Sequence, residues 1–334
     1  MNNLAMLLGS ICIYWHGVFM ALAIAIAVIV SFILFKLFKT GSCNDLLNCI
    51  LLSFPVGFVF SRLLYWSCNF EEYESLGDHL NFIRGGYTLY GVIIGVMISA
   101  GIMKLFSSSF NAGAVCDCIA AAGALSIVLG RLSAYFSGDN IGLVLKNEKY
   151  HFFPLTIYNE QRGEWLLAVF NFEAFFSLII FIVLCVIFAK NSNEKIGMKG
   201  RHGDIALLFL LMHGCSQGIF DSMHVDALYV MGNSFVRLQQ ILGAVFFTAV
   251  TVIFAIRSNK INGFKWYQIV APLVALAAVG ITLGMELNRI SYHNFIRNYS
   301  VIFLSMLGAS INGIFIYRTT LNKQTKGVTF LSKE

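Results

Sequence analysis

Long apolar stretches separated by short polar segments dominate the hydrophobic pattern of this chain of 334 residues. Two of the stretches, Gly17–Phe35 and Tyr299–Tyr317, contain no charged residue. About 20 consecutive apolar residues form a helix long enough to cross a bilayer. Nine candidate spans lie near residues 13–35, 46–66, 86–106, 113–136, 165–189, 204–223, 236–256, 267–286 and 299–317. The pattern therefore predicts an all-α, polytopic integral membrane helix bundle with about nine transmembrane helices.

The amino-acid composition excludes several other classes of protein. Hydrophobic residues make up 58% of the chain and charged residues 12%, whereas soluble domains are about 45–50% apolar and about 25% charged. A soluble globular enzyme and a disordered chain are both excluded. The net charge of +6 comes without a dense run of Lys and Arg, so we expect no nucleic-acid partner.

The charges between the spans predict an orientation. If the N-terminus lies outside, fourteen of the 23 basic residues fall in inside segments and seven in outside loops. Cytoplasmic loops of membrane proteins carry the excess of Lys and Arg. We therefore predict an outside N-terminus and a cytoplasmic C-terminus. Two long outside segments, roughly 67–85 and 137–164, are expected to be interfacial arms or plain exposed loops.

Three spans are less apolar than the others, because the second carries Arg62, the fourth Asp117 and Arg131, and the sixth Asp221. Burying a charge in a membrane helix is costly, so these helices are expected to face the protein interior or a wet cavity. The Arg131 guanidinium presents a fork that matches phosphate oxygens. The alternative is that Arg131 snorkels to the lipid headgroups. Asp117 precedes Arg131 by 14 residues, roughly 21 Å along a helix and too far for a direct ion pair.

The third span begins with small residues. It starts with Gly85 and Gly86, and glycines just before a helix leave backbone N–H groups free at its positive end, which favours an anion site. Gly91, Gly95 and Ser99 then recur every four residues. Such a stripe lets a neighbouring helix approach closely.

The sixth span carries a polar stripe made of His213, Gln217, Asp221 and His224. Their spacing of 4, 4 and 3 places all four side chains on one helical face. The stripe is either a hydrogen-bonded seam between helices or the lining of a substrate cavity. A metal site is the weakest option, because the spacing matches no zinc motif and no fourth ligand is evident. We therefore predict no metal.

Several short stretches of the sequence resemble the motifs of one protein family and occur in the same order as in that family, over roughly the first 260 residues. The stretches are Ile13–Gly17, Phe60–Tyr65, Gly85–Gly91, Gly130–Leu143 with Asp117 upstream, Phe172–Ala174, Gly203–Asp204 and His213–Gly214. The fourth resembles the signature Gly-Arg-Leu-Gly-Asn-Phe-Ile-Asn-Gly-Glu-x-x-Gly-Arg, and the third resembles Gly-Gly-Met-Ser-Phe-His-Gly. These motifs are similar to those of the bacterial prolipoprotein diacylglyceryl transferases.

The resemblance implies a reaction and its partners. The diacylglyceryl group of phosphatidylglycerol, or of another anionic phospholipid, moves to the thiol of a lipobox cysteine in a prolipoprotein, and glycerol phosphate leaves. It implies a multi-pass protein of the bacterial plasma membrane, with a site open to membrane lipids at the outer leaflet and no cofactor. Residues expected to be catalytic are Arg131, Tyr90, Asp139, Gln217 and Asp221. Residues expected to bind substrate are Arg62, His16, Gly85, Gly86, Asp117, His213 and His224.

The chain departs from the family pattern at several motif positions. In the third-span motif, Tyr90 replaces the histidine. In the fourth-span signature, Ala134 and Ser137 replace the two asparagines, Asp139 replaces the glutamate and Leu143 replaces the closing arginine. In the sixth span, Gln217 replaces an arginine and Asp221 the glutamate after it, and in the first span His16 replaces a tyrosine. A second hypothesis is therefore a catalytically degenerate relative that binds lipid, or one that serves a different acceptor. A small-molecule transporter is a third, but the sequence has no internal repeat to favour it.

The C-terminal part of the chain extends beyond this resemblance. Two further spans follow residue 260. We therefore divide the chain into a transferase-like membrane core, 1–260, and a region 261–334 that adds two transmembrane helices and a basic cytoplasmic tail.

Overall fold

The computed structural model describes residues 4–8, 11–38, 41–69, 85–160, 162–192, 200–230, 237–287 and 295–321. Within these ranges, nine helices are long and apolar enough to cross a membrane. They are α1 (Trp15–Leu37), α2 (Cys43–Cys68), α4 (Leu89–Phe106), α5 (Ala112–Leu132), α7 (Val169–Ser192), α8 (Asp204–Phe220), α9 (Leu238–Asn262), α10 (Tyr267–Leu287) and α11 (Phe295–Leu321). The predicted all-α polytopic bundle is confirmed, and each predicted span corresponds to one of these helices.

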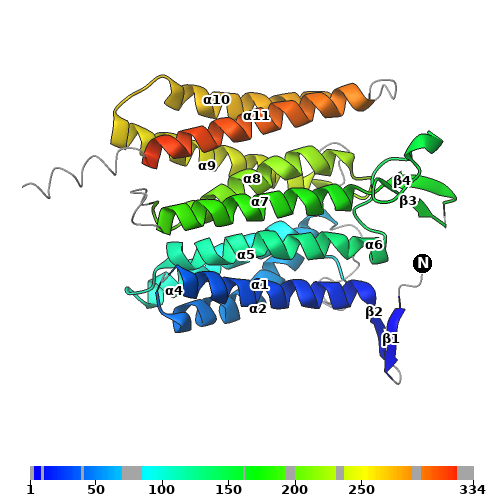
Figure 1. Ribbon diagram of the computed structural model, residues 1–334, viewed down its shortest axis with the longest axis horizontal. Helices are drawn as coiled ribbons and strands as arrows, with labels where there is room; N and C mark the ends of the chain where they lie inside the picture. Colours follow the sequence, from blue (N-terminus) through cyan, green and yellow to red (C-terminus); the bar gives the residue numbers. More distant parts are fainter. Residues whose placement is uncertain are drawn as a thin grey trace, which may run out of the picture.

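The nine helices lie side by side along the long axis of the molecule (Figure 1). In this view α10 and α11 form one edge of the bundle, and α1, α2 and α4 lie at the other edge. Successive helices alternate in direction, so α1 begins at one end of the bundle and α11 finishes at the opposite end. Which end faces the cytoplasm stays a prediction.

Two β-hairpins lie at the end of the bundle where α1 begins, which we call the hairpin end (Figure 1). Strands β1 (Leu4–Leu8) and β2 (Ile11–Tyr14) pair ahead of α1, and β3 (Thr156–Asn159) pairs with β4 (Glu164–Leu167). The second hairpin lies in and just beyond the predicted outer segment 137–164, which is therefore more ordered than a plain loop. The other predicted outer segment, 67–85, lies mostly outside the described residues.

Helix α8 is the centre of the bundle. Of the residues in its span, 83% are buried inside the protein, compared with 22–44% in the other spans. It packs against α5, α7, α9 and α11, and the prediction that this helix faces the interior is confirmed. In α2 only 28% of the span is buried. The Arg62 side chain of α2 is nevertheless buried, so its charge faces protein although most of the helix does not.

The small-residue stripe of α4 is a helix-packing surface. A Cβ added to Gly91 would lie 2.2 Å from the Ser61 Cα, and one added to Gly95 would lie 2.4 Å from the Gly57 Cα. Both contacts are with the backbone of α2, which has no flexible end that can move aside. The glycines therefore allow α2 and α4 to pack in close contact.

Replacing Gly95 with alanine is expected to destabilise the protein by about 1–3 kcal/mol, because the methyl group overpacks the α2–α4 contact. Gly101, in the same helix, is the matched control, because a Cβ added there meets nothing within 4 Å. Gly101→Ala should be neutral or slightly stabilising. Thermal unfolding of the purified variants in detergent measures both effects. Equal melting temperatures for the two variants would contradict the packing assignment.

Helices α10 and α11 belong to the same bundle as the rest of the chain. Both pack on α9, and α11 also packs on α8. The Cys215 thiol donates a hydrogen bond to the Met306 carbonyl oxygen at 3.3 Å, and the Tyr299 hydroxyl donates to the Ser222 carbonyl oxygen at 2.9 Å. The division at residue 260 falls near the end of α9 and stays a prediction, and the basic tail lies outside the described residues.

Candidate functional site

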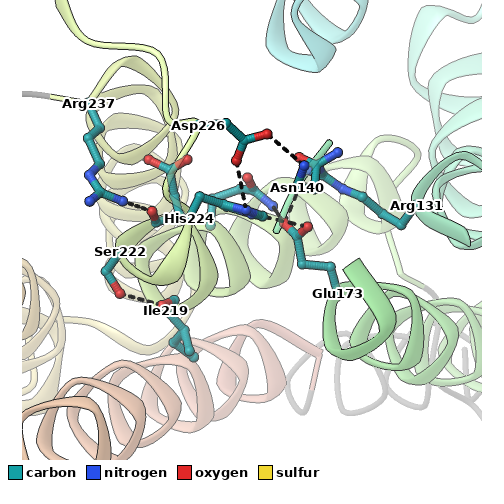
Figure 2. Close-up of polar contacts among 10 residues, drawn as sticks. Arg131, Asn140, Glu173, Ile219, Ser222, His224, Asp226 and Arg237 are labelled. Carbon is teal, nitrogen blue, oxygen red and sulfur yellow. Dashed lines mark hydrogen bonds and ion pairs between the residues drawn. The ribbon is translucent and has the colours of Figure 1, made fainter. Parts of the chain in front are cut away.

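A buried carboxylate on α7 connects three other helical segments at the hairpin end. Glu173 is 2% exposed, and its Oε1 lies 3.1 Å from the Arg131 Nη2. The Gln217 Nε2 donates to the same oxygen at 3.3 Å. The other carboxylate oxygen, Oε2, lies 3.3 Å from the His224 Nε2. Figure 2 shows Glu173 between Arg131 and His224. The structure thus brings Arg131 together with two residues of the predicted polar stripe, Gln217 and His224.

A second set of contacts completes what we call the Glu173 network, made of Arg131, Asn140, Glu173, Gln217, His224 and Asp226. The Arg131 Nη1 donates to the Asn140 Oδ1 at 2.6 Å, and the Asn140 backbone N–H donates to the Asp226 Oδ2 at 2.7 Å (Figure 2). The Asp226 Oδ1 lies 3.7 Å from the His224 Nδ1. Asn140 has a φ of +54°, a conformation that asparagine adopts more readily than most residues. The local turn therefore directs both its amide and its backbone into the network.

These contacts decide between the two interpretations of Arg131. Its side chain is 11% exposed and is bonded to a buried carboxylate and to a side-chain amide. A snorkelling arginine would instead extend its guanidinium toward the headgroups. The guanidinium is therefore held inside the protein, with two of its five N–H donors oriented by Glu173 and Asn140.

A second group of polar side chains lies where α4, α8 and α9 meet. It contains Tyr90, His213 and Gln217, and together with the neighbouring Gly243 we call it the Tyr90 cluster. The rings of Tyr90 and His213 are 5.5 Å apart between centroids. A Cβ added to Gly243 would lie 3.0 Å from the Tyr90 hydroxyl and 3.4 Å from the Gln217 Cβ. Gln217 thus belongs to both groups and links the Tyr90 cluster to Glu173.

Several buried polar atoms of the Tyr90 cluster have no hydrogen-bond partner among the described residues. They are the Tyr90 hydroxyl, both ring nitrogens of His213 and the Gln217 Oε1. Buried polar groups are normally hydrogen-bonded, because leaving them unpaired is costly. A satisfied seam between helices would have paired these atoms with protein groups. The polar stripe of α8 is therefore better suited to hold water or a polar part of a substrate.

The end of α8 is held by a buried arginine. Helix α8 ends at Phe220, and Asp221 begins the short 3₁₀ turn η5 (Asp221–Met223). Arg237 is 3% exposed, donates to the Asp221 carbonyl oxygen and lies 5.6 Å from the centre of the Tyr229 ring. Figure 2 shows Arg237 reaching toward this turn. Asp221 thus stays buried beside the Glu173 network, although the last turn is no longer α-helical.

Arg62 and the two glycines form a separate contact. The Arg62 guanidinium donates to the carbonyl oxygens of Gly85 and Gly86 and lies 5.8 Å from the centre of the Tyr65 ring. Both glycines have positive φ values, and a Cβ on Gly86 would lie 2.5 Å from the Tyr65 ring. In the structure, the glycine carbonyls hold the arginine. Whether the N–H groups nearby also bind an anion stays a prediction.

The three other predicted residues lie outside both groups. His16 is half-buried, and its Nδ1 lies 3.1 Å from the Ser133 Oγ. Asp139 is exposed, and its neighbour Asn140 makes the contact to Arg131 instead. The Asp117 carboxylate accepts hydrogen bonds from the backbone N–H groups of Gly203 and Ala206, at 2.7 and 2.9 Å.

These contacts give Asp117 a structural role, and its predicted role in substrate binding stays a prediction. Its two oxygens cap the first turn of α8, at the opposite end of the bundle from Arg131 (Figure 1). A carboxylate at a helix N-terminus stabilises that helix. Asp117 thus stabilises the N-terminus of α8 and lies away from the Glu173 network and the Tyr90 cluster.

Sequence analysis did not select four residues that the structure places at the site, namely Asn140, Glu173, Asp226 and Arg237. One signal was available: Glu173 is the only charged residue in the fifth predicted span, 165–189. A lone acid in a membrane helix indicates a functional or paired group. In the part of the chain that the structure describes, no group of three or more His, Cys, Asp and Glu side chains is arranged to hold a metal ion.

The sequence model of the family described as prolipoprotein diacylglyceryl transferase matches residues 3–254. This chain belongs to the prolipoprotein diacylglyceryl transferase family. The match contains both the Glu173 network and the Tyr90 cluster. It ends within α9, so α10 and α11 are additions to the part of the chain that the family model covers.

Similar proteins cover most of this transferase-family chain. It is 25% identical over 248 residues to the phosphatidylglycerol–prolipoprotein diacylglyceryl transferase of Clostridium kluyveri, which is 73% of this chain and 93% of the relative. It is 26% identical over 266 residues to transferase 1 of Clostridium perfringens, covering 78% and 97%. It is 23% identical over 274 residues to the transferase of Streptococcus equi subsp. zooepidemicus, covering 80% and 99%. The family resemblance of the sequence motifs is confirmed.

Proposed function

We propose that this family member transfers the diacylglyceryl group of phosphatidylglycerol to the cysteine thiol of a prolipoprotein, at the outer face of the plasma membrane. One observation carries the proposal beyond family membership. A buried arginine, Arg131, is held by Glu173 and Asn140 in the same network as Gln217, which also belongs to the Tyr90 cluster with its unpaired polar atoms. A phosphate group fits this arrangement because it is anionic and accepts several hydrogen bonds.

The chemistry of the transfer needs a fixed positive charge. A thioether forms at the glyceryl carbon while glycerol phosphate leaves with its negative charge. A preorganised donor that lies where this charge develops lowers the barrier. The contacts of Arg131 with Glu173 and Asn140 fix the orientation of the guanidinium before substrate binds, and its remaining N–H donors are suited to bind phosphate oxygens.

Complementation tests the proposed function. The chain is expressed in bacterial cells depleted of their own transferase, and a reporter lipoprotein is analysed by mass spectrometry. The proposal expects the mass of one diacylglyceryl group on the lipobox cysteine and renewed growth. An Arg131→Ala chain at equal membrane level should restore neither. A reporter that stays unmodified in cells containing the wild-type chain would contradict the proposal.

The proposed orientation places the hairpin end outside the cell. The last turns of the five helices that finish at the opposite end all contain a basic residue, namely Lys36, Lys104, Lys190, Lys260 and Arg318. Of the helices that finish at the hairpin end, only α5 has one, and that residue is the buried Arg131. The distribution of charge favours a cytoplasmic opposite end.

Cysteine labelling of intact cells should follow this orientation. Asn147 lies at the hairpin end and Ser108 in the turn between α4 and α5, and both are exposed. A membrane-impermeant maleimide should label Asn147→Cys and not Ser108→Cys. The background carries Cys12→Ser, because Cys12 is the native cysteine that is exposed. The opposite labelling pattern would exclude an outer-leaflet site.

A second candidate function is a lipid-binding relative without transfer activity. The observation that favours it is the neutral Gln217, which stands at a motif position where the family has an arginine, together with Tyr90 at the position of the motif histidine. Such a protein would bind phosphatidylglycerol in vesicles through Arg131 and leave the reporter lipoprotein unmodified.

A further inference from the structure

The proposed transfer needs a base for the acceptor thiol. A thiol has a reference pKa near 8.5 and attacks carbon as the thiolate. The residue at the motif position of the family's histidine is Tyr90, and a phenol with a reference pKa near 10 is a poor base at neutral pH. The question is which group of this chain receives the proton.

Most basic groups of the site are already engaged. Glu173 is ion-paired with Arg131, and His224 lies between Glu173 and Asp226. The His16 ring lies within hydrogen-bond distance of Ser133. The His224 ring nitrogens also have no hydrogen-bond partner among the described residues, but both lie near carboxylate oxygens. His213 is 1% exposed, and within the described ranges its ring nitrogens have neither a hydrogen-bond partner nor an ion-pair contact with a carboxylate. A neutral imidazole carries one nitrogen that accepts a proton.

The position of the His213 ring is fixed by its neighbours. It stacks on Phe209, with centroids 5.4 Å apart and planes at 5°, and its centroid lies 5.5 Å from that of Tyr90. Helices α8 and α9 pack in close contact here, because a Cβ on Gly214 would lie 2.5 Å from the Gly243 carbonyl oxygen. The ring also lies one helical turn from Gln217, which is bonded to Glu173. A histidine from α8 therefore contacts Tyr90, the residue of α4 that replaces the motif histidine.

We propose that His213 is the general base that takes the proton from the acceptor cysteine, an inference that rests on the proposed function. The proton of the S–H group moves to a ring nitrogen of His213. The electron pair of the sulfur forms a bond to the glyceryl carbon that carries the phosphate ester, and the bond from that carbon to oxygen breaks. Glycerol phosphate leaves with the bonding pair, near Arg131. The imidazolium then returns its proton to water or to the departing phosphate.

The test compares two acceptor peptides with the purified full-length protein in phosphatidylglycerol vesicles. One lipobox peptide carries cysteine and the other selenocysteine, whose selenol is already ionised at pH 7 and needs no base. His213→Gln should lower the transfer rate to the cysteine peptide by about 10²–10⁴-fold. Transfer to the selenocysteine peptide should fall by less than tenfold.

The matched control is His202→Gln, which removes an exposed histidine just ahead of α8 and should leave both rates unchanged. Equal losses for the two peptides in His213→Gln would show a structural role and overturn the proposal, as would an unchanged rate with the cysteine peptide. If the wild-type protein transfers to neither peptide, the proposed function fails and the role of His213 fails with it. If the wild-type protein transfers rapidly and His213→Gln transfers at the same rate, only the inference about His213 is overturned.

Discussion

Replacing Arg131 with alanine is expected to lower the rate of diacylglyceryl transfer by about 10²–10³-fold, the usual cost of removing one preorganised donor at a developing charge. Arg131→Lys is expected to lose much of the rate as well, although the charge is retained. The guanidinium bonds Glu173 and Asn140 through two different nitrogens, and an ammonium group cannot reproduce this fork. The lysine would leave one partner unbonded and the positive charge displaced.

The measurement is phosphatidylglycerol binding and transfer by the wild-type protein and both Arg131 variants in the same lipid. Arg257→Lys is the matched control, because Arg257 pairs with Asp204 at 2.7 Å at the opposite end of the bundle. It should change the transfer rate by no more than a small factor. Wild-type activity in Arg131→Lys would refute the fork role. Variants that lose transfer and keep their folded state would place Arg131 at the site.

Replacing Glu173 with glutamine should have the largest effect on stability. The variant keeps the shape of the side chain but leaves the buried Arg131 charge without its carboxylate partner. Removing one member of a buried ion pair typically costs about 3–5 kcal/mol. His224 loses its contact with a charged Glu173 oxygen at the same time. We expect a large fall in the melting temperature of the detergent-solubilised protein.

A double-mutant cycle tests whether this cost comes from the pair. Arg131→Gln, Glu173→Gln and the double variant are compared by chemical unfolding. Because the two side chains are in contact, the double variant should be clearly more stable than the sum of the single losses implies. Strictly additive losses would mean that the 3.1 Å contact does not couple the two residues in the folded protein.

The pattern of apolar residues was sufficient to predict the nine helices and the buried face of α8. Length and hydropathy specify a membrane helix because the bilayer demands about 20 apolar residues and internally satisfied backbones. The spacing of His213 and Gln217 likewise specified one face of α8, whereas His224 lies beyond the helix, directly after η5. All three side chains are buried. Periodicity alone did not identify which helices that face contacts.

The contacts of the site depend on residues far apart in the chain, and this is why sequence analysis missed part of it. Glu173 and Gln217 are 44 residues apart, and Asn140 and Asp226 are 86 apart. The role of Asn140 also depends on its left-handed backbone conformation, which a periodic pattern of residues does not predict. The two hairpins were missed for a related reason, since strands this short carry little alternation to recognise.

The most direct test of the account is transfer by the purified protein itself. Phosphatidylglycerol labelled in its diacylglyceryl group is mixed in vesicles with the wild-type protein and a lipobox peptide, and the products are separated by mass. The account predicts a peptide that carries the diacylglyceryl group in thioether linkage, with one glycerol phosphate released for each peptide modified. Arg131→Ala should form neither product at a comparable rate. Phosphatidylglycerol that is bound but never consumed by the wild-type protein would contradict the account and establish a lipid-binding relative instead.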